Sequence, residues 1–237
     1  NPSFEKVYAK TLTNQEVTIE NIQQLKAFLA AADINDQVIV FVAGHGLLDS
    51  KYDYYYASYD MDFKNPETKG IPYEAIEDLL DGIKPLKKLL FMDTCHSGEV
   101  DKDDVKETSN SSSNTDVMVR GVGIAYLESN ENHLGLINTS DLMRTMFTDL
   151  RKGTGATVIS ASGGLEFALE SNDWKNGLFT YCLLNGINHQ EADLNNDGEI
   201  WLQELQQFVF DNVKSLSGGR QTPTFRLENR SLNYRIW

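Results

Sequence analysis

Two segments with a continuous apolar core mark the first hundred residues, 38–44 (VIVFVAG) and 87–93 (KKLLFMD). Their cores do not alternate polar with apolar residues, which is typical of strands buried on both faces of a sheet. In 18–29 and 72–83, apolar residues recur every three or four positions, and this spacing predicts amphipathic helices. The start of 6–18 has the composition of a further strand. This alternation of strand and helix predicts an α/β fold with a mostly parallel sheet.

The pattern breaks between residues 99 and 121. This segment is polar, rich in Ser, Asn and Asp, and has no periodicity, so we predict a flexible loop there. The periodicity then returns and predicts a helix in 140–152, a strand in 156–162, and helices in 177–187 and 201–216. We expect residues 1–237 to form a single domain.

Composition narrows the function classes. The chain has 35 acidic and 21 basic residues, which gives a net charge of −14. Nucleic acids and anionic membranes attract basic surfaces, so the charge argues against both as partners and favours basic peptides or divalent cations. No apolar run approaches the ~18 residues of a membrane span, and the first residues lack a signal-peptide pattern. Two cysteines cannot build a disulfide scaffold, and we expect a cytoplasmic protein.

Two reactive side chains follow the two buried strands. His45 comes directly after the first run, and Cys95 comes two residues after the second. Ligands gather at the carboxyl ends of parallel strands, so neighbouring strands would bring the two residues to one edge. An imidazole beside a thiol favours the thiolate, which is the attacking species. The backbone N–H groups of Gly46 and Cys95 would then form an oxyanion hole. The plainer interpretation makes Cys95 a small core residue and His45 a packing or capping residue.

The two motifs together resemble a known family. VIVFVAGHG in 38–46 and LLFMDTCHSG in 89–98 are similar to the motifs of caspase-like cysteine peptidases, in their metacaspase and bacterial caspase-like branch. In caspases the histidine precedes the cysteine by about 50 residues, which is the spacing found here. Residues 159–170 and 176–187 also resemble bacterial members, and the resemblance runs from about Lys6 to the C-terminus.

This resemblance implies a caspase-haemoglobinase fold, a three-layer αβα sandwich around a mostly parallel sheet. It implies a cysteine endopeptidase with Cys95 as nucleophile, His45 as acid/base and no required organic cofactor. Family members usually have a strand and a helix before the segment that matches residues 6–13, and the chain as given lacks them. We therefore expect that an N-terminal segment or another chain completes the sheet.

The resemblance also implies a substrate pocket. Asp93 lies two residues before Cys95, and residues two apart on a strand point to the same side. In metacaspase-like relatives the matching acid lines the pocket for the residue before the cut, and a buried carboxylate favours Arg or Lys there. Alternatively, Asp93 caps the following turn. Ser160 and Ser162 resemble positions of the pocket wall.

The polar segment 99–121 is a candidate for self-processing. In the family, the segment after the nucleophile is often cut by the enzyme itself, and this one carries Lys102, Lys106 and Arg120. We expect cleavage after one of these residues, foremost Arg120, with Lys106 as a further candidate. The plain alternative is a solvated loop that is never cut.

Residues 193–204 match an EF-hand loop. The candidate calcium ligands are Asp193, Asn195, Asp197, Glu199 and Glu204. The alternative is a turn and helix cap without metal, since calcium loops usually occur in pairs. Two other functions therefore stay open beside the peptidase: a catalytically silent caspase-like interaction module, and a calcium-responsive regulatory module.

Overall fold

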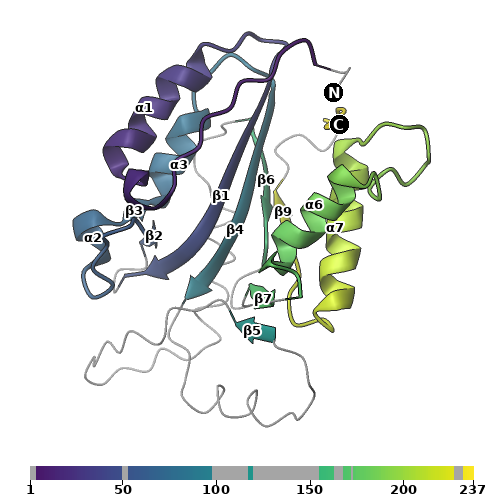
Figure 1. Cartoon of the computed structure of the whole chain (residues 1–237). Coiled ribbons are helices and arrows are strands. Elements are labelled where there is room, and N and C mark those ends of the chain that lie inside the picture. Colours follow the sequence, from purple (N-terminus) through teal and green to yellow (C-terminus); the bar gives the residue numbers. More distant parts are fainter. Residues whose placement is uncertain are drawn as a thin grey trace.

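The computed structural model describes residues 4–49, 53–97, 117–119, 155–162, 168–171, 173–226 and 232–237, with residues 48, 95–97 and 117–119 described by their backbone alone. A six-stranded sheet in the order β3-β2-β1-β4-β6-β9 lies at the centre (Figure 1). Its three central strands are parallel: β1 (Gln37–Leu48), β4 (Lys87–Ser97) and β6 (Thr157–Ser160). Antiparallel strands flank them: β2 (Tyr54–Tyr56), β3 (Ile71–Pro72) and β9 (Thr224–Arg226).

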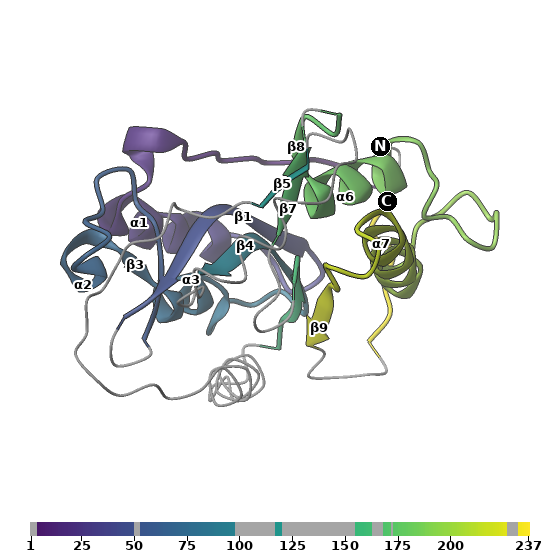
Figure 2. The ribbon, with the colours of Figure 1, turned by 90° about the horizontal axis from the view of Figure 1, so that it is seen from below.

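Helices cover both faces of this sheet (Figures 1 and 2). One face carries α1 (Ile19–Ala30) and α3 (Tyr73–Leu80), and the other carries α6 (Leu178–Asn188) and α7 (Leu202–Leu216). The side chains of β4 alternate between the two layers, with Leu90 and Met92 in the α1/α3 core and Leu89 and Phe91 in the α6/α7 core. The predicted three-layer αβα sandwich with a mostly parallel centre is confirmed.

The predicted helix signals act as expected. The Thr18 hydroxyl accepts a hydrogen bond from the backbone N–H of Asn21 at 3.2 Å, which caps the start of α1. Pro72 directly precedes α3, whose predicted apolar face is buried throughout. Two shorter helical turns, η1 (Asn14–Glu16) and α2 (Pro66–Lys69), complete this half of the chain. No helix within the described residues is long and apolar enough to cross a membrane.

A second, three-stranded sheet consists of β5 (Val117–Val119), β7 (Leu169–Ser171) and β8 (Asn176–Gly177). In Figure 1 it lies on the side where the arrows of β1 and β4 end. The prediction of a flexible loop through 99–121 is therefore wrong for residues 117–119, which pair with β7. Pairing with a strand some fifty positions later is a long-range contact, and the local composition gave no sign of it. The helix predicted in 140–152 lies outside the described residues.

The strand predicted near the N-terminus does not form. Residues 6–13 belong to no helix or strand, and the side chains of Val7 and Tyr8 are 77% and 73% exposed. A strand needs a neighbour to satisfy its backbone groups, and within the described part of the chain no strand pairs with this segment. Its composition suits a strand, but the partner decides whether a strand forms.

One side of β1 is open among the described residues. β2 pairs only with Gly46, Leu47 and Leu48, so most of the strand has β4 as its single neighbour. Ile39 and Phe41 are 46% and 45% exposed. Phe41 reaches Phe91 of the α6/α7 core, with ring centroids 6.5 Å apart, so this face of β1 is apolar but only partly covered.

Candidate active site

His45 and Cys95 lie directly opposite each other in the sheet. The register of the parallel strands β1 and β4 pairs their Cα positions, and neighbouring strands are about 4.8 Å apart. Both strands continue past these residues, to Leu48 and Ser97. The two residues therefore lie close to the strand ends, as the sequence predicts, and each strand runs two or three residues further. The end of β1 pairs with β2 on one side and with the end of β4 on the other.

The backbone around His45 is held on both sides. The His45 carbonyl accepts a hydrogen bond from the N–H of Ala57 at 2.9 Å. The side chain is half-buried, and its Nδ1 atom is buried. Gly46 pairs with Tyr56 on one side and with His96 on the other. An oxyanion role for Gly46 requires that its N–H is not used in either ladder, and this role stays a prediction.

Asp93 lies on the α6/α7 face of β4, two residues beyond Phe91. Its side chain is 0% exposed, and its Oδ2 accepts a hydrogen bond from the hydroxyl of Thr180. Thr180 is the third residue of α6, and it is half-buried. The register pairs Asp93 with Ala43, so strand alternation puts Asp93 and His45 on the same face of the sheet.

Sequence reasoning missed Thr180. It lies 87 residues from Asp93 in the chain, in a segment that was interpreted only as an apolar helix. The available signal was a hydroxyl in the first turn of that helix, beside two buried apolar neighbours. On the opposite face, the hydroxyl of Tyr54 donates to Oγ1 of the buried Thr94 at 3.4 Å. Side-chain hydrogen bonds therefore reach β4 close to Cys95 on both faces of the sheet, from helix α6 on one face and from strand β2 on the other.

Ser160 and Ser162 are both buried, and the register puts Ser160 on the face of the sheet opposite to Asp93. Ser160 pairs with Met92 in the register, and alternation puts it on the α1/α3 face of the sheet. Its hydroxyl donates to the carbonyl of Ser162 at 3.3 Å. The side chains of Ser160 and Ser162 are 3% and 1% exposed. Their role in a pocket wall stays a prediction, and the register does not bring Ser160 beside Asp93.

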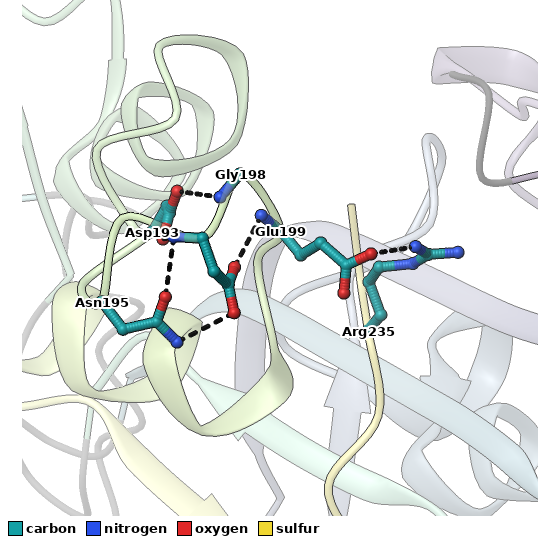
Figure 3. Close-up of polar contacts among 6 residues, drawn as sticks. Asp193, Asn195, Gly198, Glu199 and Arg235 are labelled. Carbon is teal, nitrogen blue, oxygen red and sulfur yellow. Dashed lines mark hydrogen bonds and ion pairs between the residues drawn. The ribbon is translucent and has the colours of Figure 1, made fainter.

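The EF-hand-like loop forms a hydrogen-bonded turn (Figure 3). The Asp193 carboxylate accepts from the backbone N–H groups of Asp197 at 3.1 Å and Gly198 at 2.8 Å. The side chain of Asn195 accepts from the N–H of Asp197 at 2.8 Å and donates to its carboxylate at 3.0 Å. Gly198 has a φ of 86°, a conformation that glycine adopts without strain. The early oxygens of the loop thus satisfy its own backbone.

The late acids of the loop have structural partners as well. Glu204 accepts from the N–H of Trp201 at 3.0 Å and from that of Asn195 at 3.3 Å, which joins the start of α7 to the loop. Glu199 forms an ion pair with Arg235 (Figure 3). No cluster of three His, Cys, Asp or Glu side chains in the described ranges is arranged to hold a metal ion. In this conformation the loop fits a turn and helix cap, and calcium binding stays a prediction.

The remaining residues that the sequence singled out are the candidate self-cleavage positions and the second cysteine. Lys102, Lys106 and Arg120 lie outside the described residues, although Arg120 directly follows β5. Cys182 lies on the buried face of α6 and is 1% exposed, as its predicted role of core filler requires. Burial, and next the charge of Glu191, raise the pKa of the Cys182 thiol to about 12. Near neutral pH the Cys182 thiol is therefore almost wholly protonated, which suits a core residue and not a nucleophile.

Three comparisons relate the chain to known proteins. A family model described as the caspase domain (Peptidase_C14) matches residues 4–234. Among solved structures, protein GSU0716 from Geobacter sulfurreducens is similar, with 17% sequence identity and a TM-score of 0.57, over 92% of this chain and 76% of that chain. At this identity the likeness concerns the fold alone. No curated protein matches the chain.

Proposed function

The chain belongs to the caspase-domain family Peptidase_C14, and from this premise we propose that it is a cysteine endopeptidase with Cys95 as nucleophile and His45 as general acid/base. The observation that carries the proposal is the register of β1 and β4, which pairs the two residues across neighbouring parallel strands. A thiol and an imidazole at paired positions of neighbouring strands can come within hydrogen-bonding reach, which proton transfer between them requires.

In the proposed reaction, the thiolate of Cys95 attacks the carbonyl carbon of the scissile peptide bond. A C–S bond forms, and the carbonyl oxygen takes up the electron pair, which backbone N–H groups of Gly46 and Cys95 would stabilise. His45, which holds the thiol proton, gives it to the leaving amine as the C–N bond breaks. Water then attacks the acyl carbon, loses a proton to His45 and displaces the thiolate.

We propose that the substrate has Arg or Lys before the cut. Asp93 is two residues before the nucleophile, is fully buried, and lies on the same face of the sheet as His45. A carboxylate removed from water gains most from a cationic partner, and the planar fork of Arg matches it best. An aspartate side chain at the same place would meet a like charge.

A panel of fluorogenic peptides that end in Arg, Lys or Asp tests both parts of the proposal. We expect turnover after Arg and Lys only, a loss of at least about 10³-fold in Cys95→Ala, and retained turnover in the matched control Cys182→Ala. Turnover after Asp would refute the pocket assignment. Intact masses of the wild type and Cys95→Ala test self-processing after Arg120 or Lys106. Two full-length masses that differ only by the substitution itself would rule it out.

The open side of β1 favours a second candidate function, a silent interaction module. Ile39 and Phe41 are almost half exposed, and beside them the strand has an unpaired edge within the described residues. A segment or chain that supplies a strand would cover both features. Absence of turnover on every peptide, with and without calcium, would favour this function over the peptidase.

A further inference from the structure

We propose that Thr180 is a positioning residue for substrate specificity, because its hydroxyl fixes the orientation of the Asp93 carboxylate. This inference rests on the proposed function, in which Asp93 receives the Arg or Lys side chain of the substrate. The hydroxyl of Thr180 donates to Oδ2 of Asp93. A carboxylate can rotate about its last side-chain bond, so a fixed donor to one oxygen determines the plane that a guanidinium meets.

The hydrogen bond leaves the carboxylate able to bind a substrate. An ionised carboxylate offers about four acceptor positions, so a single hydroxyl does not saturate it. The bond joins a hydroxyl to the side chain of Asp93, which is 0% exposed, and a hydrogen bond shielded from water is stronger than an exposed one. Thr180 therefore aligns Asp93 without neutralising it, whereas a Lys or Arg in its place would compete with the substrate.

The scaffold behind Thr180 is rigid. Leu178 and Phe179, which precede it in the first turn of α6, are both 0% exposed, and Cys182 in the next turn is 1% exposed. The hydroxyl is thus held by a helix end whose neighbours are locked in the core. The N-terminus of a helix also carries a partial positive charge that attracts an ionised carboxylate. A site built on such an anchored helix can hold a narrow orientation.

Two substitutions at Thr180 distinguish the effect of its hydroxyl from the effect of its side-chain shape. Thr180→Val keeps the branched shape and removes the hydroxyl, and Thr180→Ser keeps the hydroxyl. The readout is the ratio of kcat/KM for two peptides that end in Arg or in citrulline, which has nearly the shape of Arg without its charge. We expect the Arg/citrulline ratio to fall by about tenfold or more in Thr180→Val, and to stay within about twofold of the wild type in Thr180→Ser.

A double-mutant cycle ties the effect to Asp93. In an Asp93→Asn background, Thr180→Val should leave the remaining ratio unchanged, because the charge that the hydroxyl aligns is gone. A purely structural role of Thr180 would instead lower turnover of both peptides equally, together with the melting temperature. If Thr180→Val does not unfold cooperatively, Thr180→Ala takes its place in the same comparison.

The outcomes distinguish this inference from the function on which it rests. A wild-type enzyme that prefers Arg over citrulline, with the same ratio in Thr180→Val, overturns the role of Thr180 alone. A wild-type enzyme that does not cleave after Arg overturns both. A fall in the ratio that persists equally in the Asp93→Asn background also overturns the inference, because the hydroxyl would then act on something other than Asp93.

Discussion

Cys182 shows how burial suppresses the reactivity of a thiol. It packs between α6 and α7 among fully buried apolar side chains, and the cost of charging a thiol there raises its pKa to about 12. At pH 8 only about one molecule in 10⁴ would carry the thiolate at this site. Asp93 is also buried, but a hydroxyl donates to its side chain, which offsets part of the cost of burying a polar group.

The first prediction follows from the protonated state of Cys182. At pH 8 the native protein should take up one equivalent of iodoacetamide, on Cys95, and a second equivalent only after unfolding. Native Cys95→Ala should take up none. Because the pKa of Cys182 is raised, labelling at this residue should stay slow until the pH approaches 12. Peptide mass spectrometry checks the positions, and rapid native labelling of Cys182 would contradict its buried state.

At the scale of elements, the loop before α7 has the local architecture of a calcium loop but uses its oxygens internally. Glu204 links the loop to the start of α7, because its carboxylate accepts hydrogen bonds from the N–H groups of Trp201 and Asn195. An acid three residues after the N-cap is the reciprocal half of a capping box. The same carboxylate would be the last ligand of an EF-hand. One residue thus serves in both interpretations of the loop.

The second prediction uses this double role of Glu204. With a chelator present, Glu204→Ala should lower the free energy of unfolding by about 1 kcal/mol, because the cap is lost. Glu204→Gln should lose less, since an amide oxygen can still accept from the backbone. Urea denaturation of the two variants measures the difference. Equal stability of Glu204→Ala and the wild type would contradict the capping role.

The wild type and Glu204→Gln together also test whether the loop binds calcium. If the loop binds calcium, millimolar calcium should raise the melting temperature of the wild type and leave Glu204→Gln unchanged, because the amide cannot ligate as a bidentate carboxylate. Isothermal titration of the wild type provides the direct measurement. An unchanged melting temperature and no heat would leave the loop as a turn and cap.

At the scale of the whole molecule, the sheet is covered unevenly. Leu89 and Phe91 of β4 are 0% and 3% exposed under α6 and α7, whereas Ile39 and Phe41 on the same face of β1 are 46% and 45% exposed. The strand edge beside them has no partner among the described residues. Exposed apolar edges are usually protected in stable proteins. We therefore keep the proposal that an N-terminal segment or another chain completes the sheet.

The third prediction concerns this edge. In hydrogen exchange resolved to single residues, the outward amides of β1 between Gln37 and Ala43 should exchange much faster than those of β4 between Leu89 and Asp93. The inward amides of β1, which pair with β4, serve as the matched internal control. Uniform protection along β1 would contradict an open edge, and would show that another strand pairs there in solution.

Much of the fold follows from local pattern. The runs in 38–44 and 87–93 became the parallel pair β1 and β4, and the helical spacing in 18–29, 177–187 and 201–216 became α1, α6 and α7. These predictions succeed because a buried strand or an amphipathic helix requires a periodicity that a few neighbouring residues already contain. The likeness of the two motifs to caspase-like peptidases also lies within short segments, and the family match supports it.

The tertiary structure decided what depends on distant partners. The sequence placed His45 and Cys95 after two strands, but only the pairing of β1 with β4 sets them opposite each other. The strand expected in 6–13 did not form, because a strand depends on its neighbour as much as on its composition. The contact between Thr180 and Asp93 joins residues 87 positions apart, and packing of α6 on the sheet creates it. The sequence by itself determined the helices, the strands and the candidate reactive residues, because these depend on local periodicity and side-chain chemistry. Only the tertiary structure determined the register, the strand pairing and the surroundings of Asp93, because these depend on which surfaces meet in the folded chain.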